Sequence, residues 1–161
     1  VAILNGNESE AQLEALSEDI FRYYGLGCRN VSKLFVPKNY NFEKFFKGVY
    51  HWNSIITGAK YANNYDYNKA VYLMSEFDIL ENGFLMIKED ASFASPIATM
   101  FYEYYSDETE LKAKIEKNKN NIQCIVGQGF DSNEIAFGKT QQPNLWDYAD
   151  DVDTIAFLLK I

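Results

Sequence analysis

An apolar strand, an amphipathic helix and a second apolar strand open this chain, and this order constrains its fold more than any other feature. The run "VAIL" at residues 1–4 is continuously apolar, which is typical of a strand covered on both faces. Apolar residues then recur at helical spacing from Leu13 to Tyr24 and predict a helix over 8–24, followed by a strand "VSKLFV" over 31–36. Such a unit normally pairs its strands in parallel, which predicts an α/β protein.

The ends of these first elements carry local signals. Asn7 and Glu10 are spaced like a helix N-cap and its partner at the third helical position. Gly25 and Gly27 are expected to end the helix, because glycine accepts the backbone conformation that helix ends require. Pro37 is expected to stop the second strand, since proline has no amide hydrogen to donate.

The rest of the chain continues in short helices and strands. Helices are expected at 42–50, at 51–77 in two pieces broken around "NNYDYN", and at 106–119, where Asp107 and Glu110 stand at capping spacing. Strands are expected at 83–88, 97–105 and 122–127, before an irregular tail with a late helix or strand over 143–159. Neither a repeat nor an interdomain linker is visible. The prediction is one α/β domain over residues 1–161, with a mainly parallel sheet and helices on both faces.

The composition limits the classes of molecule that this chain is expected to bind. The net charge of −8 repels phosphate backbones and anionic lipids, and no apolar run approaches the length of a membrane span. Nucleic-acid binding and membrane insertion are therefore not expected. Two cysteines without framework spacing favour reduced thiols and a cytoplasmic location. Aromatic residues make up 16% of the chain, so many must pack in the core or line a pocket or interface.

Cys28 is the candidate nucleophile. It follows the helix in the stretch "YYGLGCRN", where flanking glycines let the backbone approach a substrate carbonyl. The thiolate is the attacking form, the cysteine's own amide can donate to a developing oxyanion, and Arg29 adds positive potential. The spacing alone leaves a second interpretation open, in which the glycines stop the helix and Cys28 is a small buried residue.

The sequence favours structural roles for the other candidate site residues. Cys124 lies among apolar residues in "IQCIV" and is expected to be an inert core thiol. His51 is the only histidine, so neither a multi-histidine metal site nor a cysteine–histidine protease arrangement is expected. The acidic stretch "DYADDVD" is expected to be an exposed tail rather than a cation site. The clusters "NNYDYN" and "FYEYY" could line an acyl pocket, although core and interface packing is their default interpretation.

Several motifs, taken in order, resemble the aldehyde dehydrogenase superfamily. The segment "YYGLGCRNVSKLFVP" is similar to its catalytic-cysteine segment, and "VAILNGNESEAQLEAL" to the strand and helix before it. The stretch "ASFASPIATMFYEYY" resembles the family's "EEIFGPV" region, and "IAFGKTQQPNLWDYADDVDTI" its closing region. The details most resemble the acyl-CoA reductase branch, which includes the fatty acyl reductases of bacterial bioluminescence.

The resemblance implies a fold like the aldehyde dehydrogenase catalytic domain and a reduction of acyl-CoA to aldehyde. Cys28 would accept the acyl group as a thioester, and NADPH or NADH would deliver the hydride. The cofactor would be bound mainly by a domain that this chain lacks, so residues 1–161 are expected to be a catalytic fragment that is inactive alone.

One departure concerns the cofactor. The glutamate that grips the nicotinamide ribose in the family is replaced by Ser92, and no cofactor-binding residue can be assigned. Acyl chain length, the choice between NADH and NADPH, and a homo-oligomeric state also stay open. The alternative hypothesis is a non-catalytic, aromatic-rich α/β module that binds a partner protein through "FYEYY" or "NNYDYN".

Overall fold

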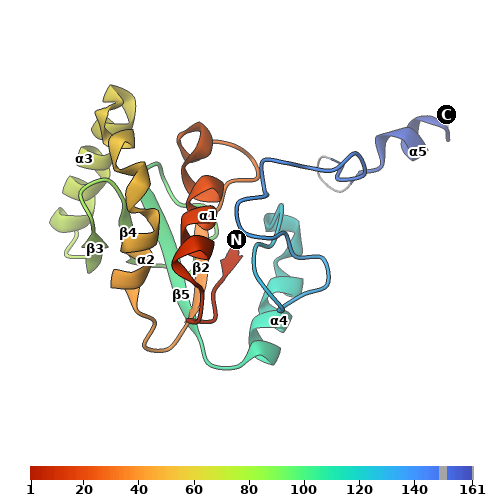
Figure 1. Ribbon diagram of the computed structural model, residues 1–161, viewed down its shortest axis with the longest axis horizontal. Helices are drawn as coiled ribbons and strands as arrows, with labels where there is room; N and C mark the ends of the chain where they lie inside the picture. The colour runs from red at the N-terminus through yellow and green to blue at the C-terminus, as the bar shows by residue number, and fades with distance from the viewer. Residues whose placement is uncertain (149–151, 161) are drawn as a thin grey trace.

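The computed structural model describes residues 1–148 and 152–160 and contains one five-stranded sheet (Figure 1). In spatial order the strands are β1 (Ala2–Ile3), β2 (Lys33–Pro37), β5 (Thr99–Tyr105), β4 (Met86–Glu89) and β3 (Ile79–Glu81). All neighbours pair in parallel except β3 and β4, which are antiparallel. The predicted α/β class with a mainly parallel sheet is confirmed.

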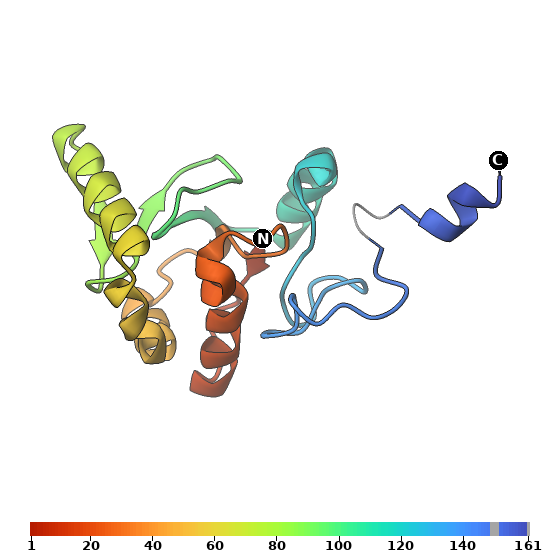
Figure 2. The same cartoon turned by 90° about the horizontal axis from the view of Figure 1, so that it is seen from above.

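Helices cover both faces of this sheet, as expected (Figure 2). The α-helices are α1 (Glu10–Phe21), α2 (Phe42–Val49), α3 (Ala59–Met74), α4 (Glu108–Lys117) and α5 (Thr154–Leu158). Shorter 3-10 turns are η1 (Arg22–Gly25), η2 (Tyr50–Thr57) and η3 (Lys119–Asn121). Helices α1, α2 and α3 lie on one face, α4 lies on the other, and α5 extends away from the body.

The alternation of side chains along β2 explains the two layers. Leu34 and Val36 belong to the larger hydrophobic cluster beneath α1, α2 and α3. Phe35 points to the opposite face and packs with Leu111 and Ile115 of α4. A strand with apolar residues on both sides is expected wherever helices cover both faces of a sheet.

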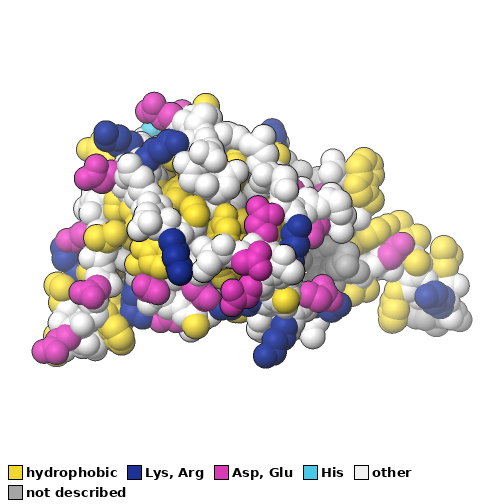
Figure 3. All heavy atoms as spheres, turned by 90° about the horizontal axis from the view of Figure 1, so that it is seen from below, with side chains coloured by type: hydrophobic (Ala, Val, Ile, Leu, Met, Phe, Trp, Pro, Cys, Tyr) yellow, Lys and Arg dark blue, Asp and Glu magenta, His cyan; other side chains and the backbone are white. Residues whose placement is uncertain are grey.

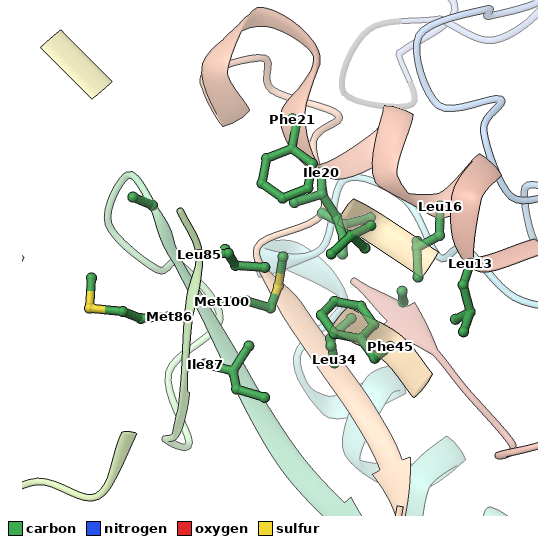
Figure 4. Packing of buried hydrophobic residues seen from close by; sticks show 14 of the residues in the cluster. Leu13, Leu16, Ile20, Phe21, Leu34, Phe45, Leu85, Met86, Ile87 and Met100 are labelled. Atoms are coloured by element: carbon green, nitrogen blue, oxygen red, sulfur yellow. The ribbon is translucent and has the colours of Figure 1, made fainter. Parts of the chain in front are cut away.

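The larger core depends on a close approach of α1 and α2 (Figure 4). Leu13, Leu16 and Phe45 are fully buried there. Gly48 allows the contact, because a Cβ atom at this position would overlap the side chain of Leu13. The helices therefore pack at a distance that only glycine permits.

The start of α1 differs from the prediction. Ser9, not Asn7, is the N-cap, and its capping partner is Gln12 rather than Glu10. The reason lies in the preceding turn, where the buried Glu8 carboxylate accepts the amides of Asn5 and Gly6 and holds that backbone outside the helix. The helix also ends at Phe21 and not at Tyr24.

The predicted break around "NNYDYN" was wrong. The chain breaks at Gly58, whose backbone is extended, and α3 continues through the motif. Tyr61, Tyr65 and Asn68 recur at helical spacing and are all buried, so packing on one face keeps the helix intact. Their polar atoms are satisfied: the Tyr61 hydroxyl donates to the Phe84 carbonyl at 2.9 Å, and the Asn68 amide to the Ile97 carbonyl at 2.9 Å.

Other departures occur in the second half. The strand predicted at 122–127 is reduced to Val126, which bridges to Ala2 and Ile135. The strand expected at 83–88 begins only at Met86, and the short edge strand β3 was not predicted. The predicted α4 and its Asp107 cap are confirmed.

Of the late helix or strand expected over 143–159, only α5 is helical, it buries no residue, and part of the segment before it is not described. The exposed apolar side chains of α5 are visible beside the grey atoms in Figure 3. Within "DYADDVD", Ala149, Asp150 and Asp151 lie outside the described residues. In the described part of the chain, no helix has the length and apolarity needed to cross a membrane.

The two ends of the parallel strands form two distinct edges. At the carboxyl edge, where β1, β2 and β5 end, the first turns of α1, α2 and α4 begin, and acidic side chains are scattered over this side (Figure 3). The helix N-termini are capped by Ser9, Asn41 and Asp107. At the amino edge, where β2 and β5 begin, lies the Cys28 loop (residues 22–32), and the loop of residues 90–97 runs from the carboxyl end of β4 back to this edge.

Candidate functional site

Cys28 lies in the loop that joins η1 to β2, at the amino edge of the sheet, and its side chain is exposed. The alternative of a small residue buried in the bend is therefore wrong. The amide of Cys28 donates to no acceptor among the described residues, which leaves it free to face a ligand. Arg29 follows directly, and its Nε is buried without an acceptor in the described structure.

The chain reverses before Cys28 through three consecutive left-handed residues. Tyr23 and Tyr24 have φ angles of 57° and 59°, and Gly25 has a φ of 74°. The left-handed region suits Gly25, but it is uncommon for tyrosine and carries strain. This turn explains why α1 ends before Tyr23 although the apolar spacing continues to Tyr24.

Asn30 fixes the loop around Cys28. Its Oδ1 accepts the Gly27 amide at 2.7 Å, and its Nδ2 donates to the carbonyls of Asp19 and Arg22 at 2.8 and 3.0 Å. A Cβ atom on Gly27 would overlap Asn30 Oδ1, so this close approach requires glycine. Asn30 thus satisfies carbonyls at the end of α1 and positions the residue before Cys28. The sequence analysis did not single it out.

Asp19 of α1 binds a segment that is distant in the sequence and lies beside the Cys28 loop. It is 1% exposed, and its carboxylate accepts the Gly138 amide at 2.6 Å and the Thr140 amide and hydroxyl at 3.0 and 2.9 Å. Burial raises the pKa of Asp19, and these hydrogen bonds oppose that effect. The segment around Gly138, which belongs to the closing region of the resemblance, therefore docks on α1 beside the Cys28 loop.

The loop of residues 90–97 is tied to the strand that follows Cys28. The Ser32 hydroxyl donates to the Phe93 carbonyl at 2.7 Å, and the buried Lys33 ammonium donates to the Asp90 carbonyl. Lys33 also pairs with Glu103 at 3.3 Å, while burial lowers the pKa of Lys33. Ser92 is exposed in this loop, and its amide donates to Asp90 at 2.9 Å.

Cys124 does not lie in the core as expected, and His51 lies at the surface. Cys124 is partly buried, its Sγ lies 3.6 Å from the Arg29 carbonyl, and burial raises the pKa of its thiol. His51 is exposed, with its Nε2 3.2 Å from the hydroxyl of the buried Ser17. Among residues 1–148 and 152–160, no three acidic, cysteine or histidine side chains are placed to hold a metal ion.

The aromatic clusters lie away from the cysteine. Tyr65 of "NNYDYN" is buried in α3 and bonds to Glu81. In "FYEYY", Tyr104 and Tyr105 pair with Val36 and Pro37 at the far end of β2 from Cys28. Their interpretation as the lining of an acyl pocket is not supported by this placement.

Two solved structures resemble this fold. One is a mutant of the indole-3-acetaldehyde dehydrogenase of P. syringae in complex with NAD+ and IAA, with a TM-score of 0.53 and 10% identity. The other is an indole-3-acetaldehyde dehydrogenase complexed with NAD+, with a TM-score of 0.52 and 10% identity. Each match covers 78% of this chain and 32% of the other. The fold is that of an aldehyde dehydrogenase domain.

At this identity the likeness establishes the fold alone. No protein-family model matches the chain, and no curated protein matches its sequence. Because the chain spans about a third of the length of these dehydrogenases, their activities belong to larger proteins.

The turn before α1, at the carboxyl edge, does not fit a dinucleotide phosphate. In α/β folds that bind one there, the pyrophosphate lies on a glycine-rich turn at a helix N-terminus. Here the Glu8 carboxylate accepts the amides of Asn5 and Gly6 before α1, and Ser9 caps that helix. A negative charge therefore takes the donors that a phosphate would need.

Proposed function

We propose that this chain is the cysteine-bearing catalytic portion of an NAD(P)H-dependent acyl-CoA reductase that converts acyl-CoA to aldehyde. The observation that carries the proposal is the exposed Cys28 in a loop whose backbone is fixed by Asn30, on an aldehyde dehydrogenase-like fold. A nucleophile needs access to the substrate and a fixed approach, and this loop combines both.

In the proposed acylation, the Cys28 thiolate attacks the thioester carbonyl of acyl-CoA. A carbon–sulfur bond to Cys28 forms, the bond to coenzyme A breaks, and the coenzyme A thiolate leaves with the electron pair. The Cys28 amide, which is free among the described residues, would donate to the oxyanion of the tetrahedral intermediate. Exchange of one thioester for another keeps the acyl group activated.

Reduction to the aldehyde requires a hydride from NADPH or NADH. In this proposal a further domain would hold the cofactor beside Cys28. The match covers 32% of dehydrogenases that were solved with NAD+, so most of their length has no counterpart in this chain. This supports the assignment of the cofactor to a further domain. The isolated chain would then be inactive as a reductase.

Steady-state turnover in the full-length protein tests this function. Acyl-CoA and NADPH or NADH should give aldehyde, and Cys28→Ser should abolish the reaction. Cys124→Ser is the matched control and should retain it, because Cys124 is partly buried. Full activity of the Cys28→Ser variant would reject the proposal.

The rival hypothesis, a non-catalytic interaction module, is favoured by the exposed apolar side chains of α5. Ile155, Phe157 and Leu158 are each about 60% exposed, and such surfaces often mark contacts with a partner. This hypothesis predicts that Cys28→Ser leaves function intact, while polar substitutions in α5 remove it.

A further inference from the structure

Helix α3 carries apolar side chains on two opposite sides. One side, which includes Tyr65, is buried against the core. On the other side, Tyr67, Val71 and Met74 are 69%, 39% and 85% exposed, and the small Ala70 is exposed with them. These four residues follow the spacing i, i+3, i+4 and i+7, which places them on one face of an α-helix. We call these four residues the outer stripe.

We infer that the outer stripe is an interface with a second copy of this chain, in which the two α3 helices pack antiparallel about a twofold axis. This inference concerns assembly and does not depend on the proposed reductase activity. It names the surface through which the chain would form a homodimer.

In the described part of the chain, no element covers the outer stripe. Helix α3 lies at one end of the molecule and α5 at the other (Figure 1). A helix with apolar residues on both sides is normally buried on both. Methionine and tyrosine are enriched in the centres of protein interfaces, where charged side chains are depleted. The outer stripe has this composition, since the nearest charged residues, Asp66 and Lys69, lie beside it on the helix surface.

Opposite charges lie at the two ends of the outer stripe. Lys60 is exposed on the same face, seven residues before Tyr67, and Glu76 and Asp78 are exposed just after α3 ends. In an antiparallel pair, Lys60 of each copy would lie beside the acidic residues of the other copy, and twofold symmetry repeats this contact. The interface would therefore pair opposite charges, although each chain carries a net charge of −8.

The order of side chains within the outer stripe also suits a second copy. In an antiparallel pair centred on Ala70 and Val71, Ala70 of one helix faces Val71 of the other, and Met74 faces Tyr67. A small residue between larger ones lets the side chains of two helices interdigitate. The matching ends and centre favour a second copy over a different protein or a further domain of the same chain.

Sedimentation equilibrium of the full-length protein tests this inference. The wild type should be a dimer at about 50 μM, and Met74→Glu should raise the Kd of the dimer at least about tenfold, because it places two carboxylates in the interface. Leu73→Glu is the matched control and should leave the Kd within about twofold, since Leu73 is 55% exposed but lies about 100° around the helix from Met74.

Two results of this experiment would overturn the inference. A monomeric wild type would show that a further domain or a different protein covers the outer stripe. A Met74→Glu dimer with an unchanged Kd would show that the copies meet through another surface, such as α5.

Reversing the charges at the ends of the stripe separates a loss of contact from a loss of folding. Lys60→Glu should raise the Kd at least about threefold, and so should Glu76→Lys combined with Asp78→Lys. All three substitutions together should restore the wild-type Kd within about twofold, because opposite charges would meet again. Unchanged values in the first two variants, or no recovery in the third, would overturn the antiparallel pairing.

Discussion

The two edges of the sheet differ in how their loops are built. At the carboxyl edge, short loops enter helices whose first turns are capped by their own side chains, Ser9, Asn41 and Asp107. At the amino edge, the Cys28 loop is strained and exposed, its own Asn30 fixes it, and the distant Gln141 donates to Asn30 at 3.4 Å. Parallel α/β sheets usually bind ligands at the carboxyl edge. The function that we propose for Cys28 would place the chemistry of this chain at the opposite edge.

The largest expected effect concerns the anchoring of the amino edge. Asp19→Ala should lower the free energy of unfolding by about 3 kcal/mol, because the buried donors of Gly138 and Thr140 lose their acceptor. Chemical denaturation measures this change. Glu14→Ala, at an exposed position of the same helix, is the control and should stay within about 0.5 kcal/mol. Equal losses of unfolding free energy for Asp19→Ala and Glu14→Ala would contradict the anchoring role of Asp19.

The second prediction compares the two cysteines. Iodoacetamide should label Cys28 at least about tenfold faster than Cys124 in the folded protein, because Cys124 is partly buried and burial raises the pKa of its thiol. Peptide mass spectrometry at neutral pH resolves the two rates, and unfolding in denaturant should make them similar. Equal labelling rates of Cys28 and Cys124 in the native protein would contradict the exposed position of Cys28.

Removing a cap should affect the carboxyl edge alone. Ser9→Ala should lower the free energy of unfolding by about 1 kcal/mol and leave the rate of Cys28 labelling unchanged. Asn7→Ala is the matched control and should have little effect, since Asn7 does not cap the helix in the structure. A larger loss of stability for Asn7→Ala than for Ser9→Ala would show that Asn7 caps the helix, as the sequence predicted.

The smallest effect is a dependence on pH at the 90–97 loop. Hydrogen bonds from the Lys88 ammonium and the Ser92 amide lower the pKa of Asp90 to about 2, from 3.8. Because the folded-state pKa lies below the unfolded value, this stabilisation is present above about pH 4 and is lost as the pH falls towards 2. The Asp90 side chain is 25% exposed and solvent screens its ion pair, so the loss should be only about 0.5 kcal/mol.

Urea titrations at pH 5 and pH 2.5 measure this dependence. Asp90→Asn should show a smaller fall in the free energy of unfolding between these pH values than the wild type. Identical falls in the two proteins would show that the Lys88 contact does not influence the carboxyl group.

The sequence analysis predicted the architecture better than the conformation of the loop around Cys28. Apolar patterning places β1, α1 and β2, and the glycines place Cys28 in the bend. The contacts around the bend join Asn30 to residues far from it in the sequence, such as Gln141, and local sequence patterns do not reveal such pairs.

The errors also have physical reasons. The left-handed backbone at Tyr23 and Tyr24 has no sequence signal, because tyrosine is not a residue that this conformation prefers. In α3, burial of Tyr61 and Tyr65 outweighs the local tendency of "NNYDYN" to break the helix.

The central claim is that Cys28 accepts an acyl group from acyl-CoA, and intact-mass spectrometry of the full-length protein tests it most directly. Incubation with acyl-CoA but without NADPH or NADH should add the mass of one acyl group to the wild type and to Cys124→Ser. Cys28→Ser should gain none, and hydroxylamine should release the adduct as expected of a thioester. A wild-type mass that stays unchanged, or an adduct that persists in Cys28→Ser, would contradict the account.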